Sequence, residues 1–231
     1  MGLSNYSTVQ RAAGRPTYDR PMAFTGFDED AIAFYRELTL NNERAFWLAN
    51  RDRYETRVAG PMHELAAALE PRFGPARLFR PYRDVRFSPD KSPYKTHAAL
   101  TFERGGYVQV SAEGVAGGAG AYQLDKEQLD RYRRAVDAPR TGAELEAALA
   151  ELRAKEVGIE IPEALKTSPR GFDAHHPRAE LLRYKGIITW ADWGVPDWFT
   201  TPEAAERIAA FLDDSAPLTR WLRANVTGTP D

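Results

Sequence analysis

The spacing of hydrophobic residues divides the chain into three successive parts. Before Pro71, apolar side chains recur every three or four positions, which is typical of amphipathic helices. Between residues 78 and 124 they mostly alternate with polar ones, the period of a half-buried strand. Helical spacing then returns, with one more strand predicted at 185–193. This order predicts an α+β fold, a single domain whose antiparallel β-meander sheet is packed by helices from both ends of the chain.

Capping residues indicate where the helices before the sheet begin. Asp28 precedes the first helix, and Phe27 is placed as its hydrophobic staple. Asn42 precedes the second helix, which Gly60-Pro61 must kink or split. The helical part is expected to end in the proline- and glycine-containing run 71–76.

Similar signals define the helices after the sheet. Capping boxes are predicted at Asp125 with Gln128 and at Thr141 with Glu144. Further helices are predicted at 179–183, 201–211 and 217–225, after a loop-rich passage at 158–177.

Four strands are predicted for the central part, at 78–87, 96–102, 107–112 and 115–124. The turns between them lie at 88–91, 105–106 and 113–114. Glycines at 117, 118 and 120 weaken the fourth strand, and there we expect a bulge or a close approach of another backbone.

We recognise no targeting signal at the ends of the sequence. Residues 1–20 are polar and lack the apolar core of a secretory signal, so we expect a disordered lead, followed by one domain at 21–227 and a tail at 228–231. No stretch approaches the roughly 18 apolar residues of a membrane span. These observations predict a soluble, cytoplasmic protein.

Composition excludes several classes of function. The 231 residues carry a net charge of -2, so a whole-surface field for nucleic acid or membranes is not expected, and any anion site must be a local cluster. The chain has no cysteine, which excludes disulfide scaffolds, thiol nucleophiles and zinc ribbons.

The common catalytic motifs are also missing. His63-Glu64 begins a zincin-like string, but Ala67 stands where the second histidine is needed. The glycine cluster near Gly118 has no following lysine and serine, no serine sits between glycines in a nucleophile elbow, and no lysine follows an acidic residue by two positions. His175 and His176 are adjacent but have no third ligand placed by spacing. No metal site is therefore predicted, and the sequence leaves any cofactor unknown.

Positive charge is concentrated between residues 77 and 97. Six cations stand there against two acids, a local charge of +4, namely Arg77, Arg80, Arg83, Arg86, Lys91 and Lys95 against Asp84 and Asp90. A hairpin brings both flanks together, so this segment predicts a site for an anion. Arginine offers a planar fork that matches phosphate or carboxylate, and lysine adds a mobile point charge.

The predicted roles follow from these chemistries. Arg86 and Lys95 grip the anion, Arg80 or Arg83 supports them, and Lys91 and Arg170 complete the predicted ligand-binding set. Arg170 lies in a proline- and glycine-containing loop that we expect to close over the hairpin.

Two residues are predicted to serve catalysis. His97, with an unperturbed pKa of roughly 6.5, is the candidate acid or base. Asp84 is predicted to orient an arginine or the imidazole.

Alternatives without a ligand stand beside this prediction. Alternating arginines and Asp84 can form a structural salt-bridge ladder, Arg77 and Lys91 are well explained by solvation alone, and His97 can be a structural histidine. The neighbouring aromatics are more often packing residues than surfaces for stacking bases.

The string R-D-V-R-F-S-P-D-K-S-P-Y-K-T-H, at 83–97, resembles the hallmark of the family catalogued as domain of unknown function 2461. The blocks at 41–54, 168–172 and 176–185, with the glycine-rich strand ending at Tyr122, are similar to other parts of that family, and the likeness extends over roughly 24–211. The resemblance implies kinship and no particular activity.

The residues themselves favour a protein that binds an anionic, phosphate-bearing small molecule or nucleotide. If it is an enzyme, hydrolysis or transfer at that phosphate is the predicted reaction class. The alternatives are a nucleic-acid-binding module and an interaction domain in which the charge ladder serves folding only.

Overall fold

An antiparallel sheet forms the centre of the protein, in the order β1-β2-β3-β4-β6-β5. The computed structural model describes residues 23–86 and 89–228. Hairpins join β1 to β4 in chain order, and the later strands add to the β4 edge, which confirms the predicted α+β fold with an antiparallel meander. The strands are β1 (Ala76–Leu78), β2 (His97–Phe102), β3 (Tyr107–Ser111), β4 (Gly114–Ala121), β5 (Ile159–Glu160) and β6 (Ile187–Gly194).

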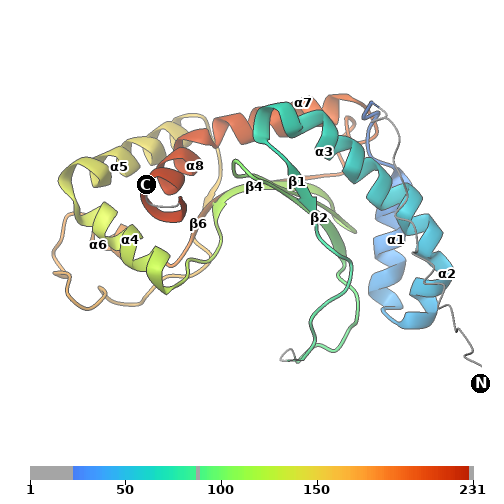
Figure 1. Cartoon of the computed structure of the whole chain (residues 1–231), viewed down its shortest axis with the longest axis horizontal. Helices are drawn as coiled ribbons and strands as arrows, with labels where there is room; N and C mark the ends of the chain where they lie inside the picture. The colour runs from blue at the N-terminus through green and yellow to red at the C-terminus, as the bar shows by residue number, and fades with distance from the viewer. Residues whose placement is uncertain (1–22, 87–88, 229–231) are drawn as a thin grey trace, which may run out of the picture.

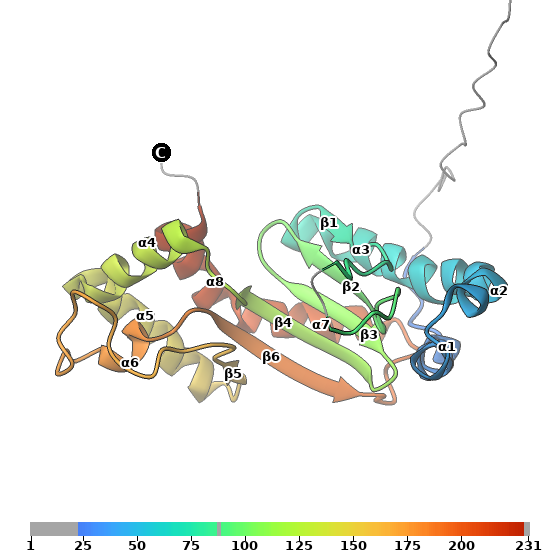
Figure 2. The ribbon, with the colours of Figure 1, turned by 90° about the horizontal axis from the view of Figure 1, so that it is seen from below.

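Helices cover one face of this sheet and flank both of its ends. In Figure 1, α3 and α7 lie over the sheet, α1 and α2 stand at one end, and α4, α5, α6 and α8 gather at the other. The helices are α1 (Glu29–Leu40), α2 (Arg44–Tyr54), α3 (Gly60–Phe73), α4 (Lys126–Asp137), α5 (Pro139–Ala154), α6 (Ala179–Leu182), α7 (Glu203–Asp214) and α8 (Ala216–Leu222), with π-helical turns η1 (Glu55–Ala59) and η2 (Arg223–Thr227). Within residues 23–86 and 89–228 the opposite face of the sheet carries no helix, as Figure 2 shows from below. We call it the open face.

Two hydrophobic cores hold the helices to the sheet. The first lies between the sheet and α1, α2, α3 and α7, and it includes Leu100 and Val108. The second lies among α4, α5, α6 and α8, and it includes Tyr132 and Trp221. The long strands β4 and β6 run from one core to the other, with Ala119 in the first and Ile187 in the second.

Local signals predicted some helix starts correctly and others not. Asp28 caps α1 by accepting from the Asp30 N–H at 2.8 Å, and Asp125 with Gln128 forms the predicted capping box of α4. Asn42 is not the cap of α2, because Glu43 is and the Asn42 side chain binds elsewhere.

The predicted capping box at Thr141 is also wrong. Helix α5 begins at Pro139, so Thr141 lies in its first turn, where its hydroxyl donates to the Ala135 carbonyl at 2.5 Å. Pro139 explains the shift, because a proline at the first turn has no N–H to leave unpaired and its fixed φ suits the helix.

Gly60-Pro61 splits the second predicted helix, as expected. The π-helical turn η1 sits between α2 and α3 and supplies the wider ring of backbone that accommodates the proline. Helix α3 then continues two residues past Pro71 and ends at Gly74, whose φ of 77° is accessible to glycine.

The predicted strands at 96–102, 107–112, 115–124 and 185–193 correspond to β2, β3, β4 and β6. The predicted strand at 78–87 is wrong over most of its length, because β1 ends at Leu78 and the following residues leave the sheet. Pro81 and Pro93 explain this, since neither has the N–H that a continuous ladder needs. The short β5 was not predicted. The expectations for residues 1–20, for Phe87 and Ser88 and for 229–231 lie outside the described residues.

Candidate anion-binding site

Residues 79–86 and 89–96 form the arm of a long hairpin, here called the hairpin arm, that projects from the sheet (Figure 1). Its two sides are joined by backbone hydrogen bonds from Arg83 N to Pro93 O at 2.9 Å and from Lys95 N to Pro81 O at 2.8 Å. Between them Tyr82 and Tyr94 form an isolated antiparallel bridge. The predicted convergence of both flanks is therefore present, although the arm is irregular and not a pair of strands.

Helices α1 and α2 anchor the hairpin arm. The buried Tyr94 ring stacks on Trp47 of α2, with centroids 4.5 Å apart and an interplanar angle of 12°. Asn42, between the two helices, exchanges two hydrogen bonds with the Tyr94 backbone. These contacts fix one side of the arm against the first core. Because Lys95 directly follows Tyr94, they also fix the position of the Lys95 backbone.

Three of the predicted ligand-binding cations are engaged within the arm. Arg83 pairs with Asp90, and Arg86 makes a two-pronged contact with Asp84 through distances of 2.7 and 2.9 Å. The Lys91 ammonium donates to the Val85 carbonyl at 3.0 Å.

The two carboxylates respond to these contacts. Hydrogen bonds from Arg86 lower the pKa of Asp84, and hydrogen bonds from Ser92, followed by Arg83, lower the pKa of Asp90. Asp84 thus orients an arginine and not the imidazole, and the outer arm resembles the alternative in which alternating charges stabilise the fold.

The remaining cations gather where the arm joins the sheet. We call Arg77, Arg80 and Lys95 the cation cluster. The Lys95 ammonium lies 5.0 Å from the centroid of the Phe79 ring, and the Arg77 guanidinium carbon lies 6.0 Å from the same centroid. Burial lowers the pKa of Lys95, and Arg80 and Arg77 lower it further. Among the described residues, Arg77, Arg80 and Lys95 have no ion pair with a carboxylate.

His97 begins β2, next to this excess of positive charge. It is paired across the strands with Ser111, and its side chain is half-buried. Burial lowers its pKa from 6.5, and Lys95 and Arg83 lower it further. His97 is therefore neutral near pH 7, with one ring nitrogen able to accept a proton.

The segment at 161–178, which carries Arg170, belongs to the part of the protein around the second core, where Ala164 forms a bridge with Tyr184. In Figure 1 this segment lies beside α4, α5 and α6, whereas the hairpin arm projects from the β1–β2 end of the sheet. Phe172 of this segment packs on that core. Nearby, His176 contacts Asp137 at 3.2 Å and accepts from Arg178 N. The described residues contain no group of three side chains suited to a metal.

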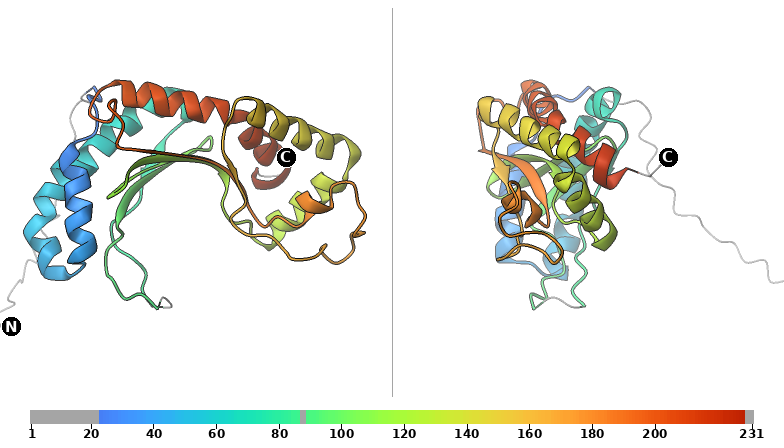
Figure 3. Two further views of the ribbon diagram at one scale, coloured as in Figure 1. Left: turned by 180° about the vertical axis from the view of Figure 1, so that it is seen from behind. Right: turned by 90° about the vertical axis from the view of Figure 1, so that its left-hand side faces the viewer.

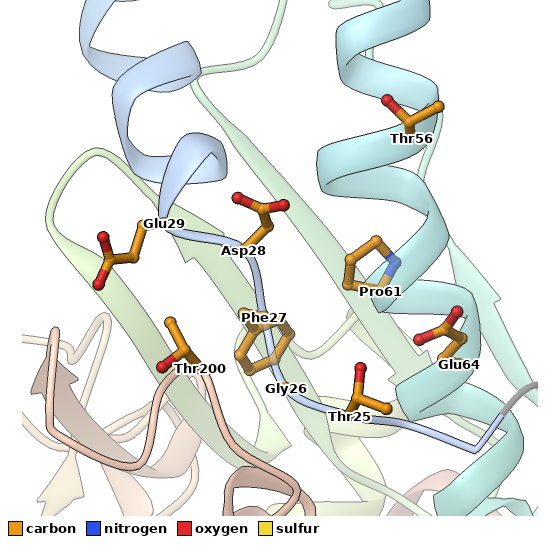
Figure 4. A pocket seen from close by; sticks show the side chains of 9 residues that line it. All are labelled: Thr25, Gly26, Phe27, Asp28, Glu29, Thr56, Pro61, Glu64 and Thr200. Atoms are coloured by element: carbon orange, nitrogen blue, oxygen red, sulfur yellow. The ribbon is translucent and has the colours of Figure 1, made fainter.

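A hollow of about 540 Å³ lies where the segment before α1 meets α3. Its charged lining residues are acidic, in contrast to the cation cluster. Figure 4 shows Asp28, Glu29 and Glu64 around it, with threonine hydroxyls. Asp28 is engaged with the α1 N-terminus and with Arg57, and burial raises the pKa of Glu64. Its acidic lining disfavours an anion, so the cation cluster remains the candidate site.

The comparisons place the chain among related proteins. The family model described as conserved hypothetical protein (DUF2461) matches residues 30–221. The chain belongs to this family. The match includes the hairpin arm and the cation cluster, and it confirms the resemblance that the string at 83–97 indicated. No curated protein and no solved structure matches the chain. Over its described part, the DUF2461 protein has no helix that is long and apolar enough to cross a membrane.

Sequence patterns missed two features of this site. Arg77 was explained by solvation, because strand alternation does not reveal that it shares the Phe79 ring with Lys95. Asn42 was assigned to a helix cap, because its partner Tyr94 lies 52 residues away.

Proposed function

We propose that this protein binds a phosphate-bearing anion at the cation cluster. The observation that carries the proposal is that Lys95 and Arg77 flank one aromatic ring without a neutralising carboxylate among the described residues. Like charges held together raise each other's free energy, and a bound anion relieves that repulsion. Phosphate fits this arrangement because its several oxygens can accept from a lysine and more than one arginine at once.

The cations between residues 77 and 95 then divide into two groups, and Arg77, which the sequence did not assign to the ligand, joins the first. Lys95, Arg80 and Arg77 contact the anion, while Arg83, Arg86 and Lys91 maintain the shape of the hairpin arm through their own contacts. In this proposal Arg170 has no direct contact with the ligand, because its segment packs on the second core through Phe172.

The proposal extends to hydrolysis or transfer at the phosphate, with His97 as the general base. A neutral imidazole beside several cations can take a proton from an attacking water or hydroxyl, and a bound anion would stabilise the imidazolium that forms. Asp84 would support the site through its contact with Arg86 and through its electrostatic interaction with Arg80, which also lowers the pKa of Asp84.

Calorimetric titration with pyrophosphate tests the binding proposal. We expect wild type to bind, Lys95→Met to weaken binding at least tenfold, and Arg80→Gln to weaken it several-fold. Lys126→Met, at the exposed start of α4, is the matched control and should bind as wild type does. Folded wild-type protein that does not bind pyrophosphate, or a Lys95→Met variant that binds it normally, would contradict the proposal.

A further inference from the structure

One row of residues crosses the open face from Arg77 on β1 to Trp190 on β6, beside the edge strand β5. Strand pairing aligns Arg77 with Thr101, Thr101 with Tyr107, Tyr107 with Gly118, and Gly118 with Trp190. Residues that pair directly across strands point to the same face of a sheet. Arg77 of the cation cluster and the two aromatic residues are therefore parts of one surface, and in the view from behind in Figure 3 no helix of the described residues lies over it.

A small hollow lies along this row. It has a volume of about 190 Å³, and its lining includes Thr101, Tyr107, Gly118, Tyr122, Ile188 and Trp190. Thr101 connects the hollow to Arg77, because the two are cross-strand partners. Pockets for whole small molecules usually measure about 300–1,000 Å³, so this hollow suits one part of a ligand and not all of it.

Aromatic side chains line the hollow together with Gly106, Gly118 and Gly120. The rings of Tyr107 and Trp190 lie 6.0 Å apart at 33°, and Tyr122 is 72% exposed. A Cβ at position 118 would lie 2.9 Å from Cε3 of Trp190, so glycine lets that ring lie directly on the backbone. The Tyr107 hydroxyl donates to Gln109 at 2.8 Å, which holds the ring in place.

Charge changes sign along the row. The β1 end carries Arg77 and the rest of the cation cluster, whereas Asp192 follows Trp190 by two residues and Glu160 pairs with Ile188. A ligand with one anionic end and one uncharged flat end would therefore bind with its anion toward β1. A long polyanion that continued past the hollow would meet the two carboxylates.

We infer that the hollow binds the base of a nucleotide whose phosphates occupy the cation cluster. This inference rests on the proposed function and names its ligand class. The positions of Arg77 and Tyr107 are two strand spacings apart, about 10 Å, a span that a nucleoside diphosphate can bridge. Stacking on Tyr107, Trp190 and Tyr122 supplies recognition of the base, because every base has an aromatic face.

The test compares ligands that carry one or both parts. Pyrophosphate, adenosine, ADP and a short single-stranded oligonucleotide are titrated against the full-length chain by calorimetry. We expect ADP to bind at least tenfold more tightly than pyrophosphate. Tyr107→Leu and Tyr122→Ser should each weaken ADP binding about tenfold and leave pyrophosphate binding unchanged. Leu48→Ser, at a 60% exposed position on α2, is the control and should change neither.

The outcomes separate this inference from the proposed function. Equal binding of ADP and pyrophosphate, with neutral ring variants, overturns the base site and leaves anion binding intact. No binding of either ligand by folded protein overturns both. An oligonucleotide that binds at least tenfold more tightly than ADP, with an affinity that falls steeply with salt, overturns the mononucleotide and favours single-stranded nucleic acid. The Tyr122 side chain is exposed, so the Tyr122→Ser variant should fold and remain informative if Tyr107→Leu does not.

Discussion

Asn42 pairs with the backbone of Tyr94 in both directions. Its amide nitrogen donates to the Tyr94 carbonyl at 3.0 Å, and its side-chain oxygen accepts from the Tyr94 N–H at 3.1 Å. The side chain thus acts as a neighbouring strand would, at a point where the hairpin arm has left the sheet. Since Lys95 follows Tyr94 directly, this pair connects the helical end of the protein to the candidate site.

Replacement of Asn42 should destabilise the protein and displace the arm. Asn42→Ala leaves two polar groups of the buried Tyr94 backbone without partners, which costs about 1–3 kcal/mol in the free energy of unfolding. Urea denaturation measures this cost. Asn41→Ala, at the C-cap of α1, removes only an exposed side-chain hydrogen bond to the Glu37 carbonyl and should cost less than about 0.5 kcal/mol. Equal effects of the two substitutions would contradict an anchoring role for Asn42.

The pKa of His97 should be sensitive to the positive charge of the cation cluster. Its pKa in the folded protein lies below 6.5, whereas the unfolded chain keeps a value of about 6.5. Between these values the unfolded state binds more protons, so stability falls as pH decreases through about 6.5 toward the folded pKa. His97→Gln should flatten the pH dependence of urea denaturation in that window.

The same residue should respond to its neighbours. Lys95→Met removes a cation that lowers the His97 pKa, and bound pyrophosphate adds negative charge, so each should raise the His97 pKa in an NMR titration. A His97 pKa at or above 6.5 in the free wild-type protein would argue against the uncompensated cluster.

Neutralisation of two cations should affect stability in opposite ways. Lys95 has no ion-pair partner among the described residues, so Lys95→Met should leave the free energy of unfolding within about 0.5 kcal/mol of wild type or raise it. Arg53 instead binds Asp30 at 2.6 and 2.7 Å and also binds Glu37. Arg53→Met should therefore cost about 1–2 kcal/mol.

Acid denaturation adds a second readout for this pair. Hydrogen bonds from Arg53 lower the pKa of both Asp30 and Glu37, so their contribution to stability is present above the unfolded pKa values and is lost as pH falls. The Arg53→Met variant should lose less stability on acidification than wild type. If Lys95→Met proved as destabilising as Arg53→Met in urea, the cation cluster would be a folding element and not a binding site.

Glycine is required at the β3–β4 turn for a steric reason. Gly114 has φ 123°, and a Cβ there would lie 1.9 Å from the Gly194 carbonyl oxygen, so Gly114→Ala should cost more than about 3 kcal/mol. Gly171 has φ 91° with nothing within 4 Å of such a Cβ, so Gly171→Ala should cost only about 1–2 kcal/mol. Thermal unfolding of both variants checks the difference, and similar melting temperatures would contradict the close approach of Gly114 to Gly194 of β6.

Much of the architecture follows from interactions within a few residues, which is why sequence patterns predicted it. The caps at Asp28 and Asp125 satisfy backbone N–H groups two and three positions away. The glycine turn at 105–106 joins two strands whose alternation is visible locally. The concentration of positive charge between 77 and 97 and the string that marks the DUF2461 family are likewise properties of one continuous segment.

Tertiary structure alone decided which of those charges remain uncompensated and what lies beside them. Alternation at 78–87 indicates an extended backbone, but whether that backbone joins a sheet depends on a partner strand. Pro81 and Pro93, on the two sides of the hairpin arm, lack the backbone N–H groups that a continuous ladder needs. Arg83 and Arg86 form ion pairs with carboxylates inside the arm, whereas Lys95 and Arg77 both lie against the Phe79 ring. The row from Arg77 to Trp190 exists only because strand register aligns residues more than a hundred positions apart, and register depends on pairing energies summed over the whole sheet.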